Sequence, residues 1–266
     1  MNVLITGAAC GLGRALANEC GRRRYNLFLT DINAEGLSCI KQGLERQFDI
    51  TVATAACDLT NKESVDKLLD IIDKHEIRFD MLLNAAGMDF EGEFIRRDRE
   101  QLVKIVLLNN AATLRITHAI LKRRRPGRQF TIVFVSSLAS IVPMPLKATY
   151  AASKRFLLDF AAALRQELRK DDVNVLTLCP GGMVTTKDTM LGIKAQGLLG
   201  EATTNPLESV SRITIDRALA GKSIYVPGIL NRILSFLARI IPRTWAAAAV
   251  YRRWNTAQSK WLSISS

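Results

Sequence analysis

Short runs of apolar and β-branched residues alternate along most of the chain with longer segments in which apolar residues recur at helical spacing. The short runs predict β-strands, because such residues fit a pleated, buried surface and turn residues bound each run. Six strands are predicted before residue 180, at residues 2–6, 26–31, 50–56, 79–84, 129–136 and 173–179.

The segments between these strands carry apolar residues three and four positions apart, which predicts helices. The helices are expected at residues 11–23, 34–47, 62–75, 99–124 and 149–169. Strands that alternate with helices of this length pair in parallel and are covered by helices on both faces. The fold class is therefore predicted to be α/β, a Rossmann-type doubly wound parallel β-sheet.

The alternation loosens after residue 180, where Gly192, Gly197 and Gly200 are closely spaced. We interpret residues 181–205 as a mobile loop over the substrate, since long loops in compact domains are commonly functional; an irregular connection is the alternative. A helix at residues 206–220 and a short strand at residues 223–226 follow. Residues 1–228 are expected to form one dinucleotide-binding and catalytic domain.

Residues 229–266 are expected to form an amphipathic, basic C-terminal extension of that domain. Apolar residues recur at helical spacing between residues 229 and 241, and Pro242 interrupts the pattern before a second helical piece at residues 244–251. The full chain of 266 residues has a net charge of +12, and residues 217–266 contain eight basic residues, no acidic residue and all three tryptophans. Peripheral contact of residues 229–261 with an anionic membrane is one hypothesis; packing over the substrate pocket or against a neighbouring subunit is the other.

The first predicted strand is followed at once by a glycine-rich turn that opens a helix. Gly7 suits the tight turn, Gly11 lets the backbone approach a pyrophosphate, and Gly13 permits close packing of helix and strand. The backbone N–H groups of the first helical turn, including that of Leu12, can bind phosphate together with the helix dipole. The turn therefore predicts a dinucleotide-binding site.

Asp31 ends the second predicted strand, twenty residues beyond Gly11. A carboxylate at this place can accept hydrogen bonds from the ribose hydroxyls of NAD and repels the 2′-phosphate of NADP. Neither Cys10 nor Ile32 supplies a basic side chain for that phosphate, although Arg14 lies close by in the sequence. NAD is therefore the expected cofactor, with NADP less favoured; capping of the next helix is the other role open to Asp31.

Ser137 follows the fifth predicted strand, and the next helix carries Tyr150 and Lys154 four residues apart. Residues at this spacing lie on one face of a helix, so the lysine can approach the phenol. A nearby cation stabilises phenolate, which makes a tyrosine usable as a general base near neutral pH. We expect Tyr150 to exchange a proton with the substrate, Lys154 to lower its pKa, and Ser137 to bind the substrate oxygen.

With these motifs the chain resembles the short-chain dehydrogenase/reductase family over about residues 2–228. The resemblance extends to Asp58 after the third strand, to Asn84, Ala86 and Gly87 after the fourth, and to Asn109 in the following helix. Further matches follow the sixth strand. They are Pro180, Gly181, Met183 and Thr185.

The family resemblance implies that Asn109, Ser137, Tyr150 and Lys154 form a catalytic tetrad. It also implies which residues contact the cofactor: the glycine turn, Asp31, Asp58, the segment after the fourth strand and the segment from Pro180 to Thr185. Tyr150 and Lys154 would have a second role, at the nicotinamide ribose. Asn109 would connect Lys154 to solvent through a water relay. A homodimer or homotetramer through the helices at residues 99–124 and 149–169 is also implied.

Other classes of site are not expected. His75 and His118 have no metal-ligand spacing, and the five cysteines form no CxxC pair, which is typical of free thiols in a reducing compartment. The N-terminus lacks the features of a signal peptide, so we expect a cytoplasmic protein, with membrane association at most peripheral. The basic clusters lack interleaved aromatic residues, so no binding of nucleic acid is expected.

The sequence thus predicts an NAD-preferring oxidoreductase that transfers a hydride between the nicotinamide and an apolar secondary alcohol or ketone. An NADPH-dependent reductase of 3-oxoacyl or polyketide-type ketones is the enzymatic alternative. A dinucleotide-sensing binding protein without turnover is the alternative of another class, and the complete set of four tetrad residues argues against it.

Overall fold

The computed structural model describes residues 1–184, 202–238 and 240–252. Seven strands form one sheet in the order β3-β2-β1-β4-β5-β6-β7, and each neighbouring pair is parallel. The strands are β1 (Asn2–Thr6), β2 (Asn26–Asp31), β3 (Val52–Ala56), β4 (Met81–Asn84), β5 (Phe130–Val135), β6 (Val173–Leu178) and β7 (Ile224–Tyr225). The predicted doubly wound parallel sheet is confirmed.

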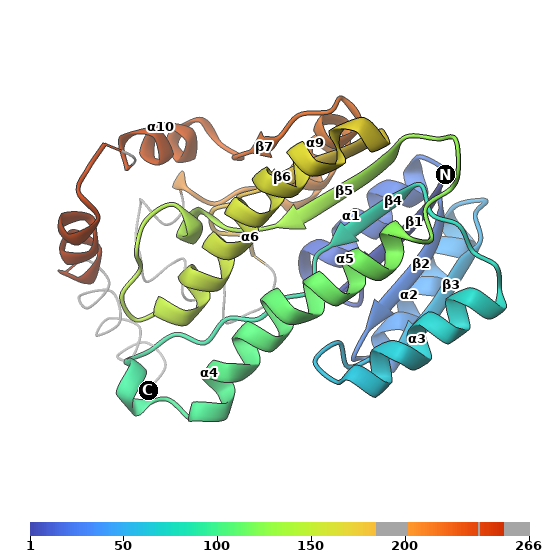
Figure 1. Ribbon diagram of the computed structural model, residues 1–266, viewed down its shortest axis with the longest axis horizontal. Coiled ribbons are helices and arrows are strands. Elements are labelled where there is room, and N and C mark those ends of the chain that lie inside the picture. The colour runs from blue at the N-terminus through green and yellow to red at the C-terminus, as the bar shows by residue number, and fades with distance from the viewer. Residues whose placement is uncertain (185–201, 239, 253–266) are drawn as a thin grey trace.

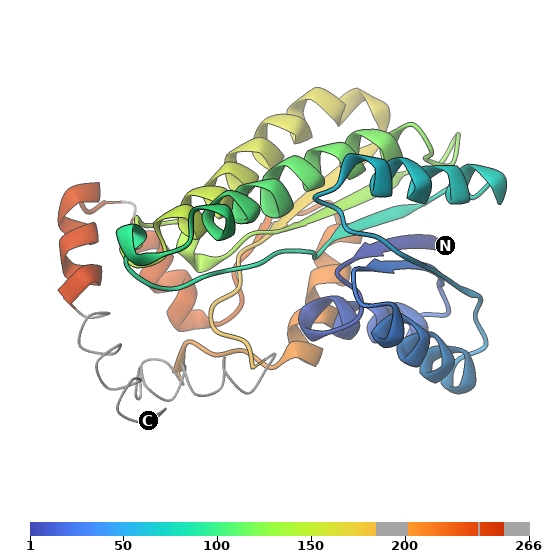
Figure 2. The same cartoon turned by 90° about the horizontal axis from the view of Figure 1, so that it is seen from below.

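Helices cover the sheet on both faces (Figure 2). They are α1 (Gly11–Arg22), α2 (Ala34–Gln47), α3 (Lys62–Lys74), α4 (Arg99–Val106), α5 (Thr113–Leu121), α6 (Ala148–Glu167), α9 (Leu207–Leu219) and α10 (Ile229–Leu237). Short helical turns η1 (Phe94–Arg96), η3 (Leu138–Ser140) and η4 (Leu168–Asp171) lie between them, and residues 243–252 are helical as well.

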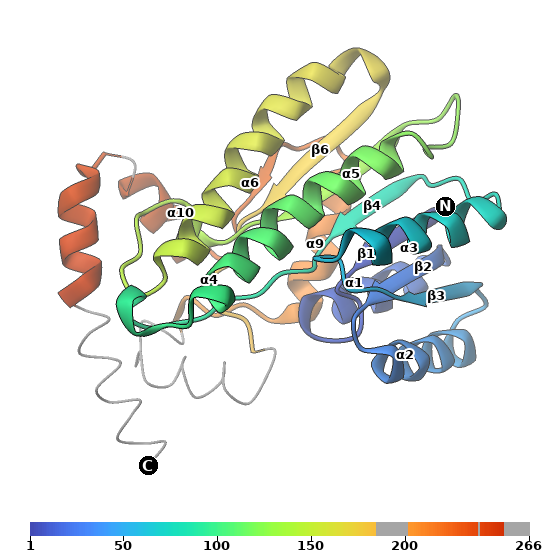
Figure 3. The same ribbon diagram turned by 60° about the horizontal axis from the view of Figure 1, so that its bottom comes forward.

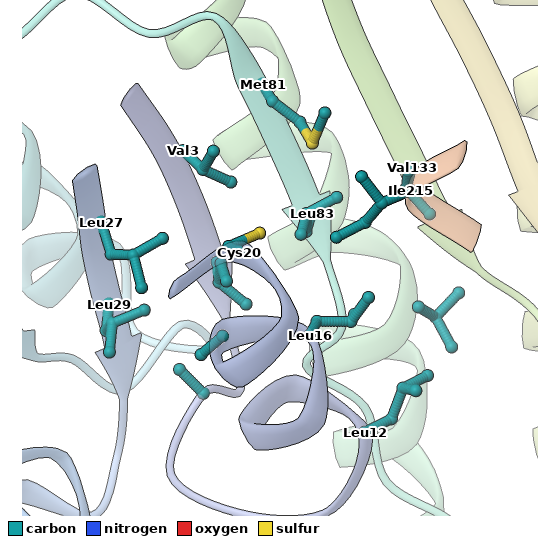
Figure 4. Packing of buried hydrophobic residues seen from close by; sticks show 14 of the residues in the cluster. Val3, Leu12, Leu16, Cys20, Leu27, Leu29, Met81, Leu83, Val133 and Ile215 are labelled. Atoms are coloured by element: carbon teal, nitrogen blue, oxygen red, sulfur yellow. The ribbon is translucent and has the colours of Figure 1, made fainter. Parts of the chain in front are cut away.

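The strand alternation divides the core into two apolar clusters, one on each face of the sheet. Val3 and Ile5 of β1 belong to the cluster that α1, α2 and α9 cover, whereas Leu4 belongs to the cluster under α3, α5 and α6. Figure 4 shows Leu12, Leu16 and other α1 side chains packed against β1, β2 and β4. Because successive side chains of a strand point to opposite faces, one short apolar run supplies both clusters.

One predicted helix differs from the structure. The segment predicted as a single helix at residues 99–124 consists of α4, a π-helical segment η2 (Leu107–Ala112) and α5, which run on as one body beside α6 (Figure 3). It ends at Leu121, because the backbone of Arg123 and Arg125 pairs with Phe79 just before β4. π-Helical segments inside α-helices are frequent at functional sites.

The carboxyl ends of all seven strands lie at one edge of the sheet, and the strand order reverses between β1 and β4. In open sheets of this kind, ligands bind at the carboxyl ends next to such a reversal. The topology therefore places the binding site between the segments that follow β1 and β4.

Two glycines of neighbouring helices give opposite predictions for stability. A Cβ on Gly43 of α2 would meet no atom within 4 Å, whereas a Cβ on Gly13 of α1 would lie 1.9 Å from the carbonyl oxygen of Gly7. We expect Gly43→Ala to raise the free energy of unfolding by about 0.5–1 kcal/mol. Gly13→Ala should lower it by about 1–3 kcal/mol, because the turn must shift. Urea unfolding of both variants measures this, and equal effects would contradict the assigned packing.

Candidate active site

The glycine turn after β1 lies directly against the segment after β4. Gly7 has a positive φ of 68°, and a Cβ on it would lie 2.7 Å from Cα of Ala86. The hydroxyl oxygen of Thr6 accepts hydrogen bonds from the backbone N–H groups of both Ala85 and Ala86, each at 3.2 Å. These contacts fix the turn at the strand reversal, where the topology places the binding site.

The amino end of α1 is suited to bind the phosphates of a dinucleotide. Its N-cap residue, Cys10, makes no side-chain hydrogen bond to the first helical turn, and Gly11 has a φ of 51°. By contrast, Asn33, Asn61 and Asp98 each cap their helix through a side-chain oxygen. The first N–H groups of a helix need an acceptor, and a phosphate supplies one with matching charge. The turn present here therefore fits a pyrophosphate.

Asp31 ends β2 beside this turn. One of its carboxylate oxygens accepts a hydrogen bond from the backbone N–H of Ala9 at 3.0 Å, and the other from that of Asn33 at 3.0 Å. Asn33, not Asp31, caps α2, since its side-chain oxygen accepts from the N–H of Gly36 at 2.9 Å. The capping role left open for Asp31 is therefore wrong, and its carboxylate is held at the glycine turn.

Asp58 follows β3 and Asn84 ends β4, so both residues lie at the same edge of the sheet. The side chain and backbone N–H of Thr60 donate hydrogen bonds to Asp58, and they lower the pKa of its carboxyl group despite the opposing effect of burial. The amide nitrogen of Asn84 donates to the hydroxyl of Thr117, 3.1 Å away, and ties β4 to α5. Cofactor contact by these two residues stays a prediction.

The side chains of Lys154 and Asn109 converge on Gly87. A Cβ on this glycine would lie 3.0 Å from Nζ of Lys154 and 3.1 Å from Oδ1 of Asn109, so only glycine fits here without displacing them. Nζ of Lys154 donates to the carbonyl oxygen of Val135 at 2.9 Å, and the side chain is almost fully buried. The structure thus brings together residues from the segment after β4, the π-helical segment and α6.

Asn109 holds the segment after β4 to α6. Its Oδ1 accepts from the N–H of Met88 at 2.9 Å, and its Nδ2 donates to the carbonyl of Met88 and to the hydroxyl of Ser153. The hydroxyl of Ser153 in turn donates to the carbonyl of Tyr150 at 2.7 Å. Ser153 was missed in the sequence, because its position between Tyr150 and Lys154 carries no chemical signal of its own.

Tyr150 lies near Ser137, Lys154 and a second lysine. Nζ of Lys154 is 5.7 Å from the centre of the phenol ring, and Nζ of Lys147 is 5.9 Å from it. Burial and the negative charge of Asp89 raise the pKa of Tyr150, whereas its hydrogen bond with Ser137 and the charge of Lys147 lower it. The phenol of Tyr150 is therefore hydrogen-bonded to Ser137 and lies beside two lysines.

The predicted effect of Lys154 on the pKa of the phenol stays a prediction. Burial lowers the pKa of Lys154 to about 8, even though Asp89 opposes the change. The cation that lowers the pKa of Tyr150 in the structure is Lys147, and the net pKa of Tyr150 is raised. The i, i+4 spacing placed the ammonium correctly near the ring but did not predict its burial.

Lys147, Asp89 and Glu91 form an ion-pair cluster that sequence analysis missed. Nζ of Lys147 lies 2.6 Å from an oxygen of Asp89 and 3.1 Å from one of Glu91. Burial lowers the pKa of Lys147, but the two carboxylates raise it by more, and the lysine stays charged beside Tyr150. No motif predicts this cluster, because its members come from two different loops.

Only part of the predicted segment after β6 lies among the described residues. The carbonyl of Pro180 accepts from the N–H of Leu138 at 2.8 Å, and Met183 packs against the core cluster under α1 and α9. A Cβ on Gly181 would lie 2.4 Å from the carbonyl oxygen of Thr203. Thr185 and most of the predicted substrate loop at residues 181–205 lie outside the described residues, so their predicted roles stay predictions.

A parallel sheet with a glycine turn at its strand reversal defines a dinucleotide-binding fold. Residues 1–193 match the family model described as short chain dehydrogenase. The chain belongs to the short-chain dehydrogenase family, which confirms the predicted resemblance.

Two curated relatives illustrate the similarity. A very-long-chain 3-oxoacyl-CoA reductase of Laccaria bicolor is 29% identical over 176 residues, which cover 65% of this chain and 52% of the relative. The 17-beta-hydroxysteroid dehydrogenase type 3 of Mus musculus is 29% identical over 237 residues, which cover 87% of this chain and 76% of the relative. The chain spans about half the length of the very-long-chain 3-oxoacyl-CoA reductases that it matches.

A solved structure shows the same fold. The 3-oxoacyl-[acyl-carrier protein] reductase from Brucella melitensis, with bound NAD, matches with a TM-score of 0.74 at 23% identity. The match covers 85% of this chain and 89% of that protein. At this level of identity, the likeness establishes the arrangement of strands and helices.

The ion-pair cluster predicts a change in pH dependence. Because Asp89 raises the pKa of Tyr150, Asp89→Asn should lower it. In an assay of alcohol oxidation, for which the sequence predicts Tyr150 as the proton acceptor, we expect the acid limb of the kcat/KM profile to move to lower pH. Asp159→Asn is the matched control, since Asp159 lies on α6 and pairs with the exposed Arg155. An unmoved or upward-shifted limb in Asp89→Asn would refute the assigned electrostatics.

Proposed function

We propose that the chain is an NAD(P)-dependent oxidoreductase that interconverts a secondary alcohol and a ketone. The observation that carries the proposal is the convergence of Ser137, Tyr150 and Lys154 at the carboxyl edge of the sheet, beside a glycine turn suited to a pyrophosphate. Membership of the short-chain dehydrogenase family supports it. A binding protein without turnover has no need for a tyrosine whose pKa is shifted by Lys147, Asp89 and a hydrogen bond with Ser137.

The proposed roles of the residues follow from their surroundings. Ser137 orients the substrate oxygen, and Tyr150 accepts the alcohol proton in oxidation or donates it in reduction. Lys154 binds the nicotinamide ribose, while Asn109 keeps α6 and the segment after β4 in register. The bound dinucleotide supplies the hydride acceptor or donor.

We propose NAD as the preferred dinucleotide. The carboxylate of Asp31 is held at the glycine turn by two backbone N–H groups, where it would accept from ribose hydroxyls and repel a 2′-phosphate. Arg14 is the basic residue near the glycine turn that could have bound the 2′-phosphate of NADP. It lines a hollow of about 300 Å³ between α1 and α9, together with Glu19 and Glu208. The two carboxylates in the lining of that hollow support a role for Arg14 other than phosphate binding.

We propose an apolar substrate of the long-chain acyl or steroid class. The names of two relatives, a very-long-chain 3-oxoacyl-CoA reductase and a 17-beta-hydroxysteroid dehydrogenase, support this range. The first name also favours the runner-up, an NADPH-dependent reductase of 3-oxoacyl groups. A screen of apolar alcohols and ketones with both cofactors, followed by the absorbance of the reduced nicotinamide, separates the two functions.

Removal of the phenolic hydroxyl tests the proposed chemistry. Tyr150→Phe should lower kcat by about 10²–10⁴-fold, the usual contribution of a positioned acid or base, while the dissociation constant for NADH stays nearly unchanged. Tyr251→Phe is the matched control, because Tyr251 is exposed in the extension, and it should keep full turnover. Undiminished turnover by Tyr150→Phe would exclude Tyr150 as the proton carrier.

Replacement of the carboxylate tests the cofactor preference. Asp31→Ser should lower kcat/KM with NAD by about 10–100-fold, since hydrogen bonds to a charged group contribute about 1.5–3 kcal/mol. Activity with NADP should fall less or rise, because the repulsion is removed. Asp49→Ser, at an almost fully exposed carboxylate, is the control and should change neither value. Better activity with NADPH than with NADH in the unsubstituted chain would contradict the proposal.

A further inference from the structure

The helix α10 is packed with its polar side inward. Asn231 and Ser235 are buried, with exposed fractions of 1% and 5%. Nδ2 of Asn231 donates to the carbonyls of Thr203 and Pro227, and the hydroxyl of Ser235 donates to the carbonyl of Asn231. A helix that covers a core usually buries its apolar stripe instead.

The apolar side of α10 faces outward, and the exposed apolar surface continues beyond the helix. Ile229 is 73% exposed and Phe236 is 65% exposed. Large apolar residues are also exposed between residues 240 and 251. The residues of this surface, which we call the apolar face, are Ile229, Ile233, Leu234, Phe236, Leu237, Ile240, Ile241, Trp245 and Tyr251. So many neighbouring exposed apolar residues are unusual on a soluble monomer and indicate an interaction surface.

Exposed basic side chains accompany the apolar face. Arg232 lies within α10, and Arg243 and Arg252 lie in the helix at residues 243–252. No aspartate or glutamate occurs anywhere from residue 217 to residue 266. An apolar helical surface with arginines and tryptophan nearby is the composition of a helix that lies in the interface of an anionic membrane.

The apolar face lies close to the candidate active site. A Cβ on Gly181, in the segment after β6, would lie 2.8 Å from Nδ2 of Asn231, so α10 is seated directly against that segment. Figure 1 shows α10 and the following helix at the end of the molecule toward which the strands point. The exposed Phe94 and Ile95 lie in η1, the turn that leads into α4.

We propose that the apolar face docks onto an anionic lipid surface, with the active-site end of the molecule toward the membrane. Its apolar residues insert into the interface, and Arg232, Arg243 and Arg252 bind lipid phosphates. Such docking is peripheral: no helix among the described residues is long and apolar enough to cross a bilayer. The docking does not depend on the proposed function, since it rests on the exposure, the charge and the position of the apolar face in the fold.

Charge favours lipid over a second copy of the chain as the occupant. In a two-fold interface the same surface meets itself, so the arginines of one apolar face would approach those of the other. With no acidic residue from 217 to 266 to offset them, that approach brings like charges together. The predicted homodimer or homotetramer through α4, α5 and α6 involves different surfaces and stays a separate prediction.

The three tryptophans of the chain, Trp245, Trp254 and Trp261, all lie in the extension, so intrinsic fluorescence reports on this region alone. The full-length chain is mixed with vesicles of phosphatidylglycerol and phosphatidylcholine, or with vesicles of phosphatidylcholine alone, and bound protein is measured by flotation. We expect binding and a blue-shifted tryptophan emission with the anionic vesicles. Raising NaCl from 0.1 M to 0.5 M should weaken the binding, because salt screens the arginines.

Two double variants divide the apolar and the electrostatic contributions. Ile233→Ser with Phe236→Ser should lower vesicle binding at least tenfold. Arg232→Glu with Arg243→Glu should lower it by about fivefold or more per residue on anionic vesicles. Two controls should bind as the unsubstituted chain does. The apolar control is Ile71→Ser with Leu114→Ser, at exposed positions on α3 and α5, and the charge control is Arg128→Glu. Circular dichroism verifies that each variant is folded.

The outcomes separate lipid from the other occupants. Loss of vesicle binding in both double variants, with the controls unchanged, supports the docking. Absence of binding to anionic vesicles, or equal binding by Ile233→Ser with Phe236→Ser, overturns it. A blue shift that grows with protein concentration without vesicles, and is lost in that same variant, also overturns it, because the apolar face is then a contact between two copies of the chain.

Discussion

The backbone of Gly7 lies against the backbone of Ala86, and the rest of the site depends on this close contact. Any side chain at residue 7 would separate the two segments, since even a Cβ there would come within 2.7 Å of the neighbouring Cα. The hydroxyl of Thr6 holds the same two segments together from the side. The chain after β4 then continues to Gly87, where Lys154 and Asn109 meet, so the turn and the proton-transfer residues keep a fixed separation.

The second constraint is the set of buried polar bonds that holds α6. The hydroxyl of Ser136 donates to the carbonyl of Lys154 at 2.7 Å, and Nδ2 of Asn110 donates to the carbonyl of Ser153 at 2.9 Å. Asn109 and Asn110 are consecutive, yet both bond to α6, which is possible because they lie in the wider turn of the π-helical segment. Unsatisfied polar groups in this interior would be costly, so these bonds fix both the rotation and the axial position of α6.

The sequence was sufficient for those features that depend on local spacing. Strand and helix periods, the glycine turn and the four-residue interval between Tyr150 and Lys154 each follow from a few consecutive residues. The Lys147 cluster could not be predicted, because Asp89 is 58 positions away and the two loops meet only in the folded chain. The positive φ of Leu146 and its backbone bond to Gly92 help to bring these loops together. The π-helical segment escaped prediction because its apolar spacing resembles that of an ordinary helix.

The packing of α10 shows why periodicity alone does not decide which side of a helix is buried. The apolar positions between residues 229 and 241 predicted a helix with two unlike sides, and either side could have faced the core. The carbonyls of Thr203 and Pro227 need donors at the place where α10 meets the domain, and Asn231 supplies both hydrogen bonds. Turning the apolar side inward would withdraw this amide from both carbonyls. The carbonyl of Thr203 would keep the hydrogen bond that it accepts from Nδ2 of Asn205 at 3.0 Å, whereas the carbonyl of Pro227 would lose its bond to Asn231. Backbone groups contributed by other segments, and not only the hydrophobicity of the helix itself, therefore contribute to its orientation, in which the apolar face lies outward.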